Sequence, residues 1–276
     1  MTYQNYVEVL VGKQGAEGKL IKDLTIEFSV RFNITNSTNS AEIRIFNMSD
    51  ETYNYLLEKD SSVILKVGED RKVLYIGDIV SVSNAINRSD SVTIIECKDG
   101  YYQLANRKIS VGFEENVDIN TVLNKVISDV NFIKGKYNLP NKTYKNGFSA
   151  VGTLAEVLTK IVKSLGGEYT YKIVNRALLI YKKNEPIPNS PVYNLTLESG
   201  ILEIPYRFYN FKINRNETNS NISEGWKIRT LLIPELLPES IIRIQTSEVS
   251  GLFRVKESEF VGSQTEWFCN LKIEQE

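Results

Sequence analysis

The chain has 276 residues, of which 42% are hydrophobic and 24% are charged, a composition typical of folded proteins rather than disordered ones. Its 33 basic and 34 acidic residues give a net charge of -1, which argues against a dedicated nucleic-acid-binding protein, because such proteins carry a basic surplus. The absence of histidine excludes Ser-His-Asp and Cys-His nucleophile systems and imidazole metal sites.

The sequence also disfavours a membrane protein and a secreted protein. No apolar run approaches the roughly 18 residues of a membrane span, and the N-terminus lacks the basic region and apolar core of a secretory signal. Cys97 and Cys269 lie in apolar, strand-like runs, so we expect two buried free thiols rather than a disulfide. Two cysteines without histidine cannot form a usual structural zinc site. We therefore expect no metal, no cofactor and no membrane insertion.

Residues 1–105 are predicted to be almost entirely strand. Apolar and polar residues alternate over Leu24–Phe32, Ala41–Ile45 and Val63–Val67, which indicates strands with one buried face. The glycines and lysines of Gly12–Lys19 superficially resemble a phosphate-binding loop. The segment lacks the Ser or Thr that would hold magnesium, and no helical pattern follows it, so a hairpin or loop is expected there.

One short helix, over residues 49–59, interrupts these strands. Ser49 is a suitable N-cap, and Asp50 and Glu51 place negative charge on the first turn, where the helix dipole favours it. A single helix within a run of strands is unusual for a sandwich and suits a small barrel that a helix closes on one side.

Residues 106–185 change from a two-residue period to a helical one. Apolar residues recur at steps of three and four over Ile119–Val130 and Leu154–Leu165, which predicts two amphipathic helices. Ser149 is the expected cap near the start of the second helix. A hairpin turning at Asn175-Arg176 should follow. The block is therefore predicted to be a small α+β domain.

Residues 186–276 return to strands. A proline-containing connector over residues 186–204 precedes strands that begin near residue 205, and the polar stretch Asn214–Ser223 is expected to form a loop. The predicted layout is strand block, mixed block, strand block, with domains at residues 1–105, 106–185 and 186–276.

Carboxylates are the remaining candidates for catalysis. Glu114, Glu115 and Asp118 lie where a helix begins, and the helix dipole explains acidic residues there better than glycosidase chemistry does. A carboxylate-based cell-wall hydrolase remains an alternative, but no catalytic residue is assigned.

These blocks resemble the baseplate hub (tail hub) family of contractile phage tails and phage-tail-like bacteriocins. Residues 41–49, 63–68, 73–82 and 94–104 (AEIRIFNMS, VILKVG, VLYIGDIVSV, IIECKDGYYQL) are similar to the N-terminal element order of that family. NVDINTVLNKV and TLAEVLTKIVKSLGGEYTYKIVNRALLIY resemble its inserted domain, and SGILEIPYRF with WKIRTLLIPELLPESIIRI and GLFRVKESEFVGSQTEWFCNLKIE resembles its second barrel.

The resemblance implies two tube-protein-like antiparallel β-barrels flanking the α+β insertion, with the helix at 49–59 in the first barrel. Three chains would form a ring that joins a sixfold tail tube to a threefold central spike, at the baseplate of a virion or phage-tail-like particle assembled in the bacterial cytoplasm. Implied partners are the chain itself as a homotrimer, the tube or tube-initiator protein, the spike, the tape-measure protein and the baseplate wedge proteins, without sequence-specific nucleic-acid binding.

The resemblance leaves related roles open. A type VI spike hub and the tail-tip hub of a non-contractile phage are alternatives, and no appended cell-wall hydrolase is expected after the last predicted strand. The loops Asn33–Ser40, Gly68–Lys72 and Asn214–Ser223 are the expected contacts with neighbouring rings.

Overall fold

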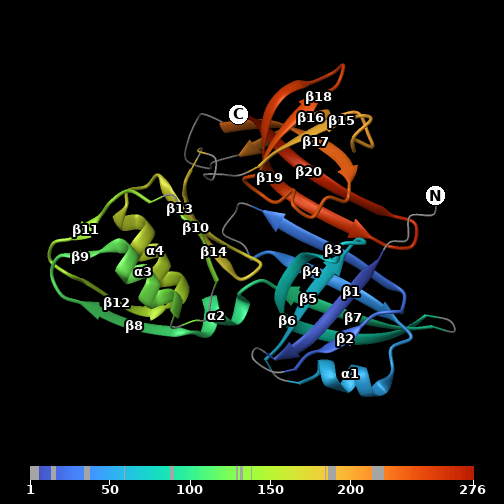
Figure 1. The fold of residues 1–276 in the computed structure, drawn as a ribbon, viewed down its shortest axis with the longest axis horizontal. Helices are drawn as coiled ribbons and strands as arrows, with labels where there is room; N and C mark the ends of the chain where they lie inside the picture. The colour runs from blue at the N-terminus through green and yellow to red at the C-terminus, as the bar shows by residue number, and fades with distance from the viewer. Residues whose placement is uncertain are drawn as a thin grey trace.

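The computed structural model describes residues 6–13, 17–33, 38–58, 60–87, 90–128, 130, 133–137, 139–183, 185, 191–212 and 221–276. These residues form a first strand block, an insertion that holds the two longer helices, and a second strand block (Figure 1). The expected mainly-β fold with an α+β insertion is confirmed.

The first strand block and the short helix predicted within it come first in the chain. The elements are β1 (Val7–Lys13), β2 (Lys19–Ile21), β3 (Ile26–Asn33), β4 (Ser40–Phe46), α1 (Asp50–Leu56), β5 (Ser61–Val67), β6 (Lys72–Asn87) and β7 (Asp90–Lys98). β1 and β2 form an antiparallel hairpin, as expected for the segment that resembles a phosphate loop. Ser49 caps α1 by accepting from the backbone N–H of Thr52, but the helix ends at Leu56 and is shorter than the predicted 49–59.

The insertion contains more strand than its sequence predicts. Its elements are α2 (Tyr101–Asn106), β8 (Lys108–Phe113), β9 (Val117–Asp118), α3 (Ile119–Ser128), β10 (Ile133–Tyr137), β11 (Thr143–Tyr144), β12 (Phe148–Thr153), α4 (Leu154–Ser164), β13 (Tyr169–Val174) and β14 (Ala177–Lys182). The predicted cap of α4 is wrong: Ser149 lies within β12, opposite Gly112 of β8. Thr153 caps the helix instead, through a reciprocal capping box with Glu156.

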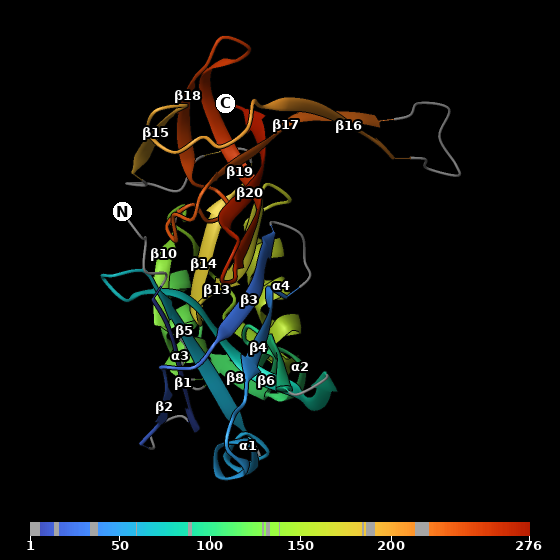
Figure 2. The same cartoon turned by 90° about the vertical axis from the view of Figure 1, so that its right-hand side faces the viewer.

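The second strand block follows the connector. Its elements are β15 (Val192–Thr196), β16 (Tyr206–Lys212), β17 (Asn221–Leu231), β18 (Ile241–Gln245), β19 (Ser250–Gly262) and β20 (Trp267–Gln275). β16 and β17 form a hairpin arm that extends away from the body of the molecule (Figure 2).

The two strand blocks are joined edge to edge, which the sequence does not predict. β3 of the first block pairs antiparallel with β19 of the second, from Phe28 opposite Gly262 to Asn33 opposite Glu257. We call this pairing the seam. It places thirteen strands of the described chain in one sheet, and both blocks share one hydrophobic core, separate from that of the insertion.

Aromatic side chains fill the core beneath the seam. The ring of Phe32 from β3 meets that of Phe260 from β19 edge-to-face at 6.0 Å, and Phe28 meets Trp267 in the same manner at 5.6 Å. Phe32 also contacts the buried ring of Tyr75. Such pairs add about 0.5–1.5 kcal/mol each beyond the burial of their area, so the seam is a stable part of the fold.

The two strand blocks repeat one strand order. The first block runs β3-β4-β7-β6 across the sheet, and the second runs β16-β17-β20-β19. In each case these are the first, second, fifth and fourth of five successive strands, and the third strand (β5 or β18) pairs with the fourth. The chain therefore contains two copies of one β-unit.

Candidate functional site

The candidate functional site is one face of the eight strands β16-β17-β20-β19-β3-β4-β7-β6, which lie side by side across the seam. Residues opposite each other in register share a face of a sheet, and the other face of these strands, apart from β16, is packed in the core. We call the exposed face the polar wall. It carries Ser29, Arg31, Glu42, Arg44, Ser81, Ser83, Glu96, Lys98, Lys227, Arg229, Glu257, Glu259, Asn270 and Lys272.

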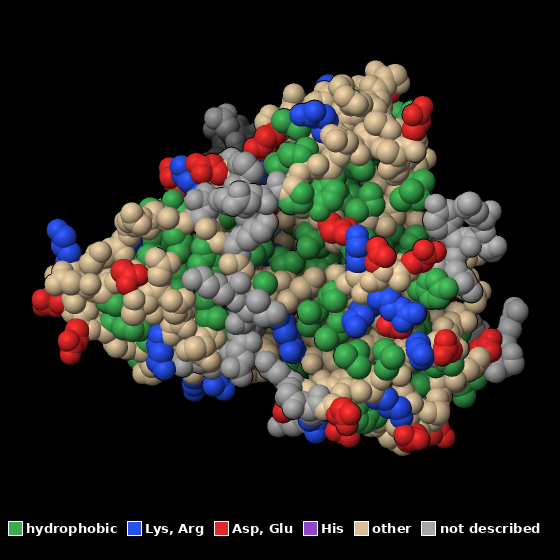
Figure 3. Space-filling model, viewed as in Figure 1, with side chains coloured by type: hydrophobic (Ala, Val, Ile, Leu, Met, Phe, Trp, Pro, Cys, Tyr) green, Lys and Arg blue, Asp and Glu red, His purple; other side chains and the backbone are tan. Residues whose placement is uncertain are grey.

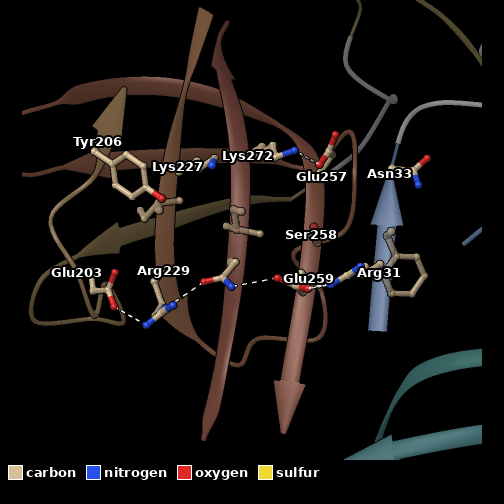
Figure 4. A pocket seen from close by; sticks show the side chains of 14 residues that line it. Arg31, Asn33, Glu203, Tyr206, Lys227, Arg229, Glu257, Ser258, Glu259 and Lys272 are labelled. Carbon is tan, nitrogen blue, oxygen red and sulfur yellow. Dashed lines mark hydrogen bonds and ion pairs between the residues drawn. The ribbon is translucent and has the colours of Figure 1, made fainter. Parts of the chain in front are cut away.

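A row of hydrogen-bonded side chains runs along the polar wall and across the seam (Figure 4). Nε of Arg229 donates to Oδ1 of Asn270 at 3.0 Å, and Nδ2 of Asn270 donates to Oε2 of Glu259 at 3.2 Å. Nε of Arg31 donates to Oε1 of Glu259 at 2.7 Å from the other side of the seam. Glu203 pairs with Arg229 at the end of the row. The row therefore connects the two strand blocks on their outer face, as the aromatic rings do beneath it.

Ion pairs engage four of the six basic side chains of the polar wall: Arg31, Arg44, Arg229 and Lys272. Lys272 pairs with Glu257 at 2.5 Å and Arg44 with Glu42 at 2.7 Å. Burial opposes ionisation of Glu259, but hydrogen bonds from Asn270 and Arg31 outweigh it and hold the pKa of Glu259 below its usual value. Acidic and basic side chains are likewise interspersed over the face of the first block seen in Figure 3. Because firm binding of a polyanion needs unpaired basic charge, such a surface can border one without holding it.

A shallow groove of about 460 Å³ follows the row of side chains. Its lining combines three of these ion pairs, Arg229–Glu203, Arg31–Glu259 and Lys272–Glu257, with the side chains of Tyr206 and Lys227, and the groove is open to solvent. Carboxylates that are already paired with cations are poor general bases, so the groove offers polar contacts rather than acid–base chemistry.

The insertion is anchored to the first strand block through the predicted hairpin turn. Asn175 and Arg176 have positive φ angles of 51° and 61°, the conformation of a type I′ turn between β13 and β14. The buried carboxylate of Asp99 accepts the backbone N–H groups of Asn175 at 2.6 Å and Arg176 at 3.0 Å. The side chain of Asn175 accepts from the N–H of Ile76 and donates to the carbonyl of Leu74. The turn is thus held by β6 and by the end of β7.

Buried charges surround this turn. The guanidinium of Arg176 pairs with Asp78 at 2.6 Å, and both side chains are largely buried. Burial raises the pKa of Asp99 to about 6, although the hydrogen bonds from Arg176, Asn175 and Asn39 oppose the rise. Burial lowers the pKa of the Lys172 amine to about 8. We call Asp78, Asp99, Asn175 and Arg176 the docking cluster. It fixes the position of the insertion relative to the sheet.

Of the acidic residues considered for catalysis, Asp118 has a structural role. Asp118 accepts the N–H groups of Asn120 and Thr121, so it caps the start of α3. A hydrogen bond from the Thr121 hydroxyl and those N–H groups lower the pKa of Asp118. Glu114 and Glu115 are exposed. In the described part of the chain no group of three His, Cys, Asp or Glu side chains is arranged to hold a metal ion.

Two further sequence predictions concern the cysteines and the loops. Cys97 and Cys269 are buried free thiols, as expected. Gly68–Lys72 forms the turn between β5 and β6, with positive φ at Gly68 and Arg71. The predicted loop Asn33–Ser40 lies partly outside the described residues, and so does Asn214–Ser223, of which residues 221–223 begin β17.

The polar wall was not identified from the sequence. Its signal was present in the alternation of Glu27, Ser29 and Arg31 in β3, but alternation does not show which face meets solvent. No helix within the described ranges is long and apolar enough to cross a membrane.

Comparison with known structures shows what the fold is similar to. The 43 kDa tail protein of prophage MuSo2 from Shewanella oneidensis superposes with a TM-score of 0.69 at 8% identity, over 99% of this chain and 98% of that one. The tail protein from Neisseria meningitidis MC58 gives a TM-score of 0.68 at 11% identity, over 99% and 97%. The E. coli c3393 protein, described as a type VI secretion component similar to the T4 bacteriophage tail proteins gp27 and gp5, gives 0.62 at 9% identity, over 96% and 76%.

Comparison by sequence gives a different outcome. No protein-family model matches the chain, and no curated protein sequence matches it. Because the tail proteins share only 8–11% sequence identity with this chain, their similarity establishes a shared fold and nothing more. The chain therefore has the fold of phage tail proteins, and its resemblance to the baseplate hub family is confirmed at the level of that fold.

Proposed function

We propose that this chain is the hub of a contractile injection system, either a phage or a phage-tail-like bacteriocin. Three copies would form a ring that joins the sixfold tail tube to the threefold central spike. The observation that carries this proposal is the repeated strand order β3-β4-β7-β6 and β16-β17-β20-β19. A chain with two copies of one β-unit presents six such units when three chains close a ring, so a single protein can face sixfold and threefold partners.

The predicted domains take separate roles in this proposal. Residues 1–105 and 186–276 supply the two tube-like units, and residues 106–185 brace the ring from outside or contact the spike. The docking cluster supports the bracing role, because a turn held by a buried ion pair and four hydrogen bonds transmits force without hinging.

The polar wall is the proposed lining of the central channel. The opposite face of the same strands, apart from β16, is packed in the core, so this face is the one that a ring of sheets can turn toward its axis. Its paired charges support passage of DNA or of tape-measure protein without strong retention. The protein would act mechanically, at a baseplate assembled in the bacterial cytoplasm, with tube or tube-initiator, spike, tape-measure and wedge proteins as partners.

A mass measurement tests the proposal. Native mass spectrometry of the purified chain, alone and mixed with the tube and spike proteins of its own particle, should find assemblies that contain three copies. A chain that stays monomeric in the presence of both proteins contradicts the hub function. Peptidoglycan cleavage that one carboxylate substitution abolishes would instead support the hydrolase alternative.

A type VI spike hub is the second candidate. The described type VI component from E. coli shares the fold over 96% of this chain, which favours that system as an alternative host machine. Both candidates require a ring of three, so the identity of the co-purifying tube and spike proteins distinguishes them.

A further inference from the structure

Each strand block has the same register irregularity, which aligns the two β-units residue by residue. β6 and β7 pair with a shift between Ile79 and Ser81, and β19 and β20 pair with a shift between Val255 and Glu257. Val80 and Lys256 are therefore the extra residues of equivalent bulges. Following the register from these bulges makes residues 81–86 of β6 equivalent to residues 257–262 of β19.

The same register aligns the first strands of the two units. β4 pairs with β3 and β17 pairs with β16 in the same antiparallel manner. From each bulge, the cross-strand pairs can be followed strand by strand to the first strand of the unit, β3 or β16. This makes Ser29 of β3 equivalent to Tyr206 of β16, and Phe32 equivalent to Tyr209. The alignment thus covers both strands that meet at the seam.

The seam uses one open edge from each unit, and two equivalent edges are left over. β19 of the second unit meets β3 of the first. Their counterparts are β6 and β16, and in the described chain residues 79–87 of β6 pair only with β7, while β16 pairs only with β17. Ser81 and residues 83–86 are exposed, and residues 80–86 carry no charge and no proline, the usual protections of an edge strand.

The strand directions fit a continuation of the sheet. Every neighbouring pair along the eight strands is antiparallel, so β16 at one end runs opposite to β6 at the other. The β16 strand of a second copy can therefore join β6 in the antiparallel sense used throughout the sheet. Both strands also reach beyond the body of the chain: the β16–β17 arm extends outward in Figure 2, and the end of the β6–β7 hairpin projects in Figure 1.

We propose that residues 80–87 of β6 pair with β16 of a second copy of this chain and reproduce the seam between molecules. The intramolecular register places Ala85 opposite Tyr206 and Val82 opposite Tyr209 of the next copy, just as Val261 lies opposite Ser29 and Ser258 opposite Phe32. The contact is heterologous, because two different edges meet, so copies add head to tail until a ring closes. This inference rests on the proposed three-chain ring and names the surfaces that build it.

Paired cysteine substitutions test the register. Directly opposed antiparallel residues have Cα atoms about 4.5–5.5 Å apart, within reach of a disulfide. The variants Ala85→Cys/Tyr206→Cys and Val82→Cys/Tyr209→Cys should each form covalent dimers and trimers of the assembled protein on oxidation, seen on a non-reducing gel. The native thiols Cys97 and Cys269 are buried, and burial raises the pKa of each, so they stay unreactive.

A matched control exchanges the tyrosines. Ala85→Cys/Tyr209→Cys and Val82→Cys/Tyr206→Cys contain the same four substitutions, and Tyr206 and Tyr209 are similarly exposed at 54% and 50%. The cysteines in these controls are three residues out of register, about 10 Å along the strand, which is too far for a disulfide. Expected yields are at least about tenfold lower than for the in-register pairs.

The outcomes separate this inference from the proposed function. If native mass spectrometry finds three chains but the in-register pairs do not cross-link, or the controls cross-link equally, the β6–β16 contact is overturned and the hub function stands. If no three-chain assembly forms with tube and spike proteins present, both are overturned. Circular dichroism of each variant verifies the fold, and agreement between two independent pairs guards against failure of one variant to fold.

Discussion

The two strand blocks place a buried charge at the same point of their repeat, but with opposite sign. Asp78 of β6 and Arg254 of β19 each stand two residues before their bulge, and each is 3% exposed. Their cross-strand neighbours, Lys98 and Glu274, are also exchanged in sign. Each unit therefore has a buried charge at this position, paired by nearby side chains, and the sign of that charge differs between the two units.

The partners of these two charges explain the difference. Asp78 is paired by Arg176 from the insertion, at 2.6 Å. Arg254 is paired by Glu239 at 3.4 Å and by Glu276, both from its own block. The first block thus uses its buried charge to hold another part of the chain, whereas the second block satisfies its charge internally. The repeated unit thus keeps its strand order, while its buried polar residues make different attachments in the two blocks.

Removing either arginine is expected to give the largest loss of stability. Arg176→Met leaves Asp78 buried without its cation, and Arg254→Met removes from buried Glu239 its hydrogen-bonded cation, although Lys256 still acts on it. Breaking a buried pair from one side costs about 3–5 kcal/mol of unfolding free energy. Chemical denaturation measures the loss, and hydrogen exchange locates it: only Arg176→Met should raise exchange in β13 and β14. Equal exchange in the two variants would contradict the assignment of Asp78 to docking.

The two blocks also differ in whether the edge of the equivalent strand is covered: β19 is paired at the seam, whereas the end of β6 is open. Phe260 of β19 is fully buried at the seam, whereas Asn84, its equivalent in β6, is exposed. Phe260→Ala should cost about 3–5 kcal/mol, because it opens a cavity against Phe32. Asn84→Ala should change the stability of the single chain by less than about 0.5 kcal/mol. Thermal unfolding of both variants at a concentration that keeps the chain monomeric tests the contrast, and a loss below about 1 kcal/mol for Phe260→Ala would contradict it.

Local sequence signals predicted the local features of this fold. The cap at Ser49, the helical stripes of α3 and α4 and the turn at Asn175-Arg176 were all visible in short windows. The capping box Thr153–Glu156 was also visible, but a nearby serine was assigned in its place. In these elements the deciding residues lie within a few positions of one another.

The long-range features could not be predicted in the same way. Arg31 and Glu259, which join the blocks across the seam, are 228 positions apart, and Asp99 lies 76 positions from the turn that it holds. The internal repeat is also hidden from the sequence. Asp78 and Arg254 occupy equivalent positions in the two units, and so do Asn84 and Phe260. The units therefore share backbone hydrogen-bonding topology without sharing side chains.

The docking cluster should make the stability of the first block depend on pH. Burial raises the pKa of Asp99 to about 6, above its value of about 3.9 in an unfolded chain, so the folded state binds the proton more tightly. The stability that Asp99 contributes is then full below about pH 4 and declines as the pH rises to about 6, by roughly 3 kcal/mol. The groups that face it are the Arg176 and Asn175 N–H groups, Asn39, Asp78 and Lys172.

Comparison with Asp99→Asn isolates this contribution, because the asparagine does not titrate. Denaturant midpoints measured from pH 4 to 7.5 should show the wild-type chain losing its advantage over the variant between about pH 4 and 6, with a constant difference above pH 7. A constant difference across the whole range would show that Asp99 titrates normally and that its burial is relieved in solution.

The smallest effect on folding is expected where the open edge is changed, and there the consequence for assembly is largest. Ile86 of β6 and Val151 of β12 are both 83% exposed, so lysine at either position should change the unfolding free energy of the single chain by less than about 0.5 kcal/mol. Ile86 lies on the edge proposed to receive β16 of the next copy, where a lysine is the charge that natural edge strands use to prevent pairing. Ile86→Lys should therefore weaken three-chain assembly on the order of tenfold or more per contact, measured by native mass spectrometry over a concentration series. Val151→Lys, on an edge of the insertion, should assemble as the unmodified chain does. Equal assembly of the two variants would mean that β6 stays open in the particle, and that the seam within the chain has no counterpart between chains.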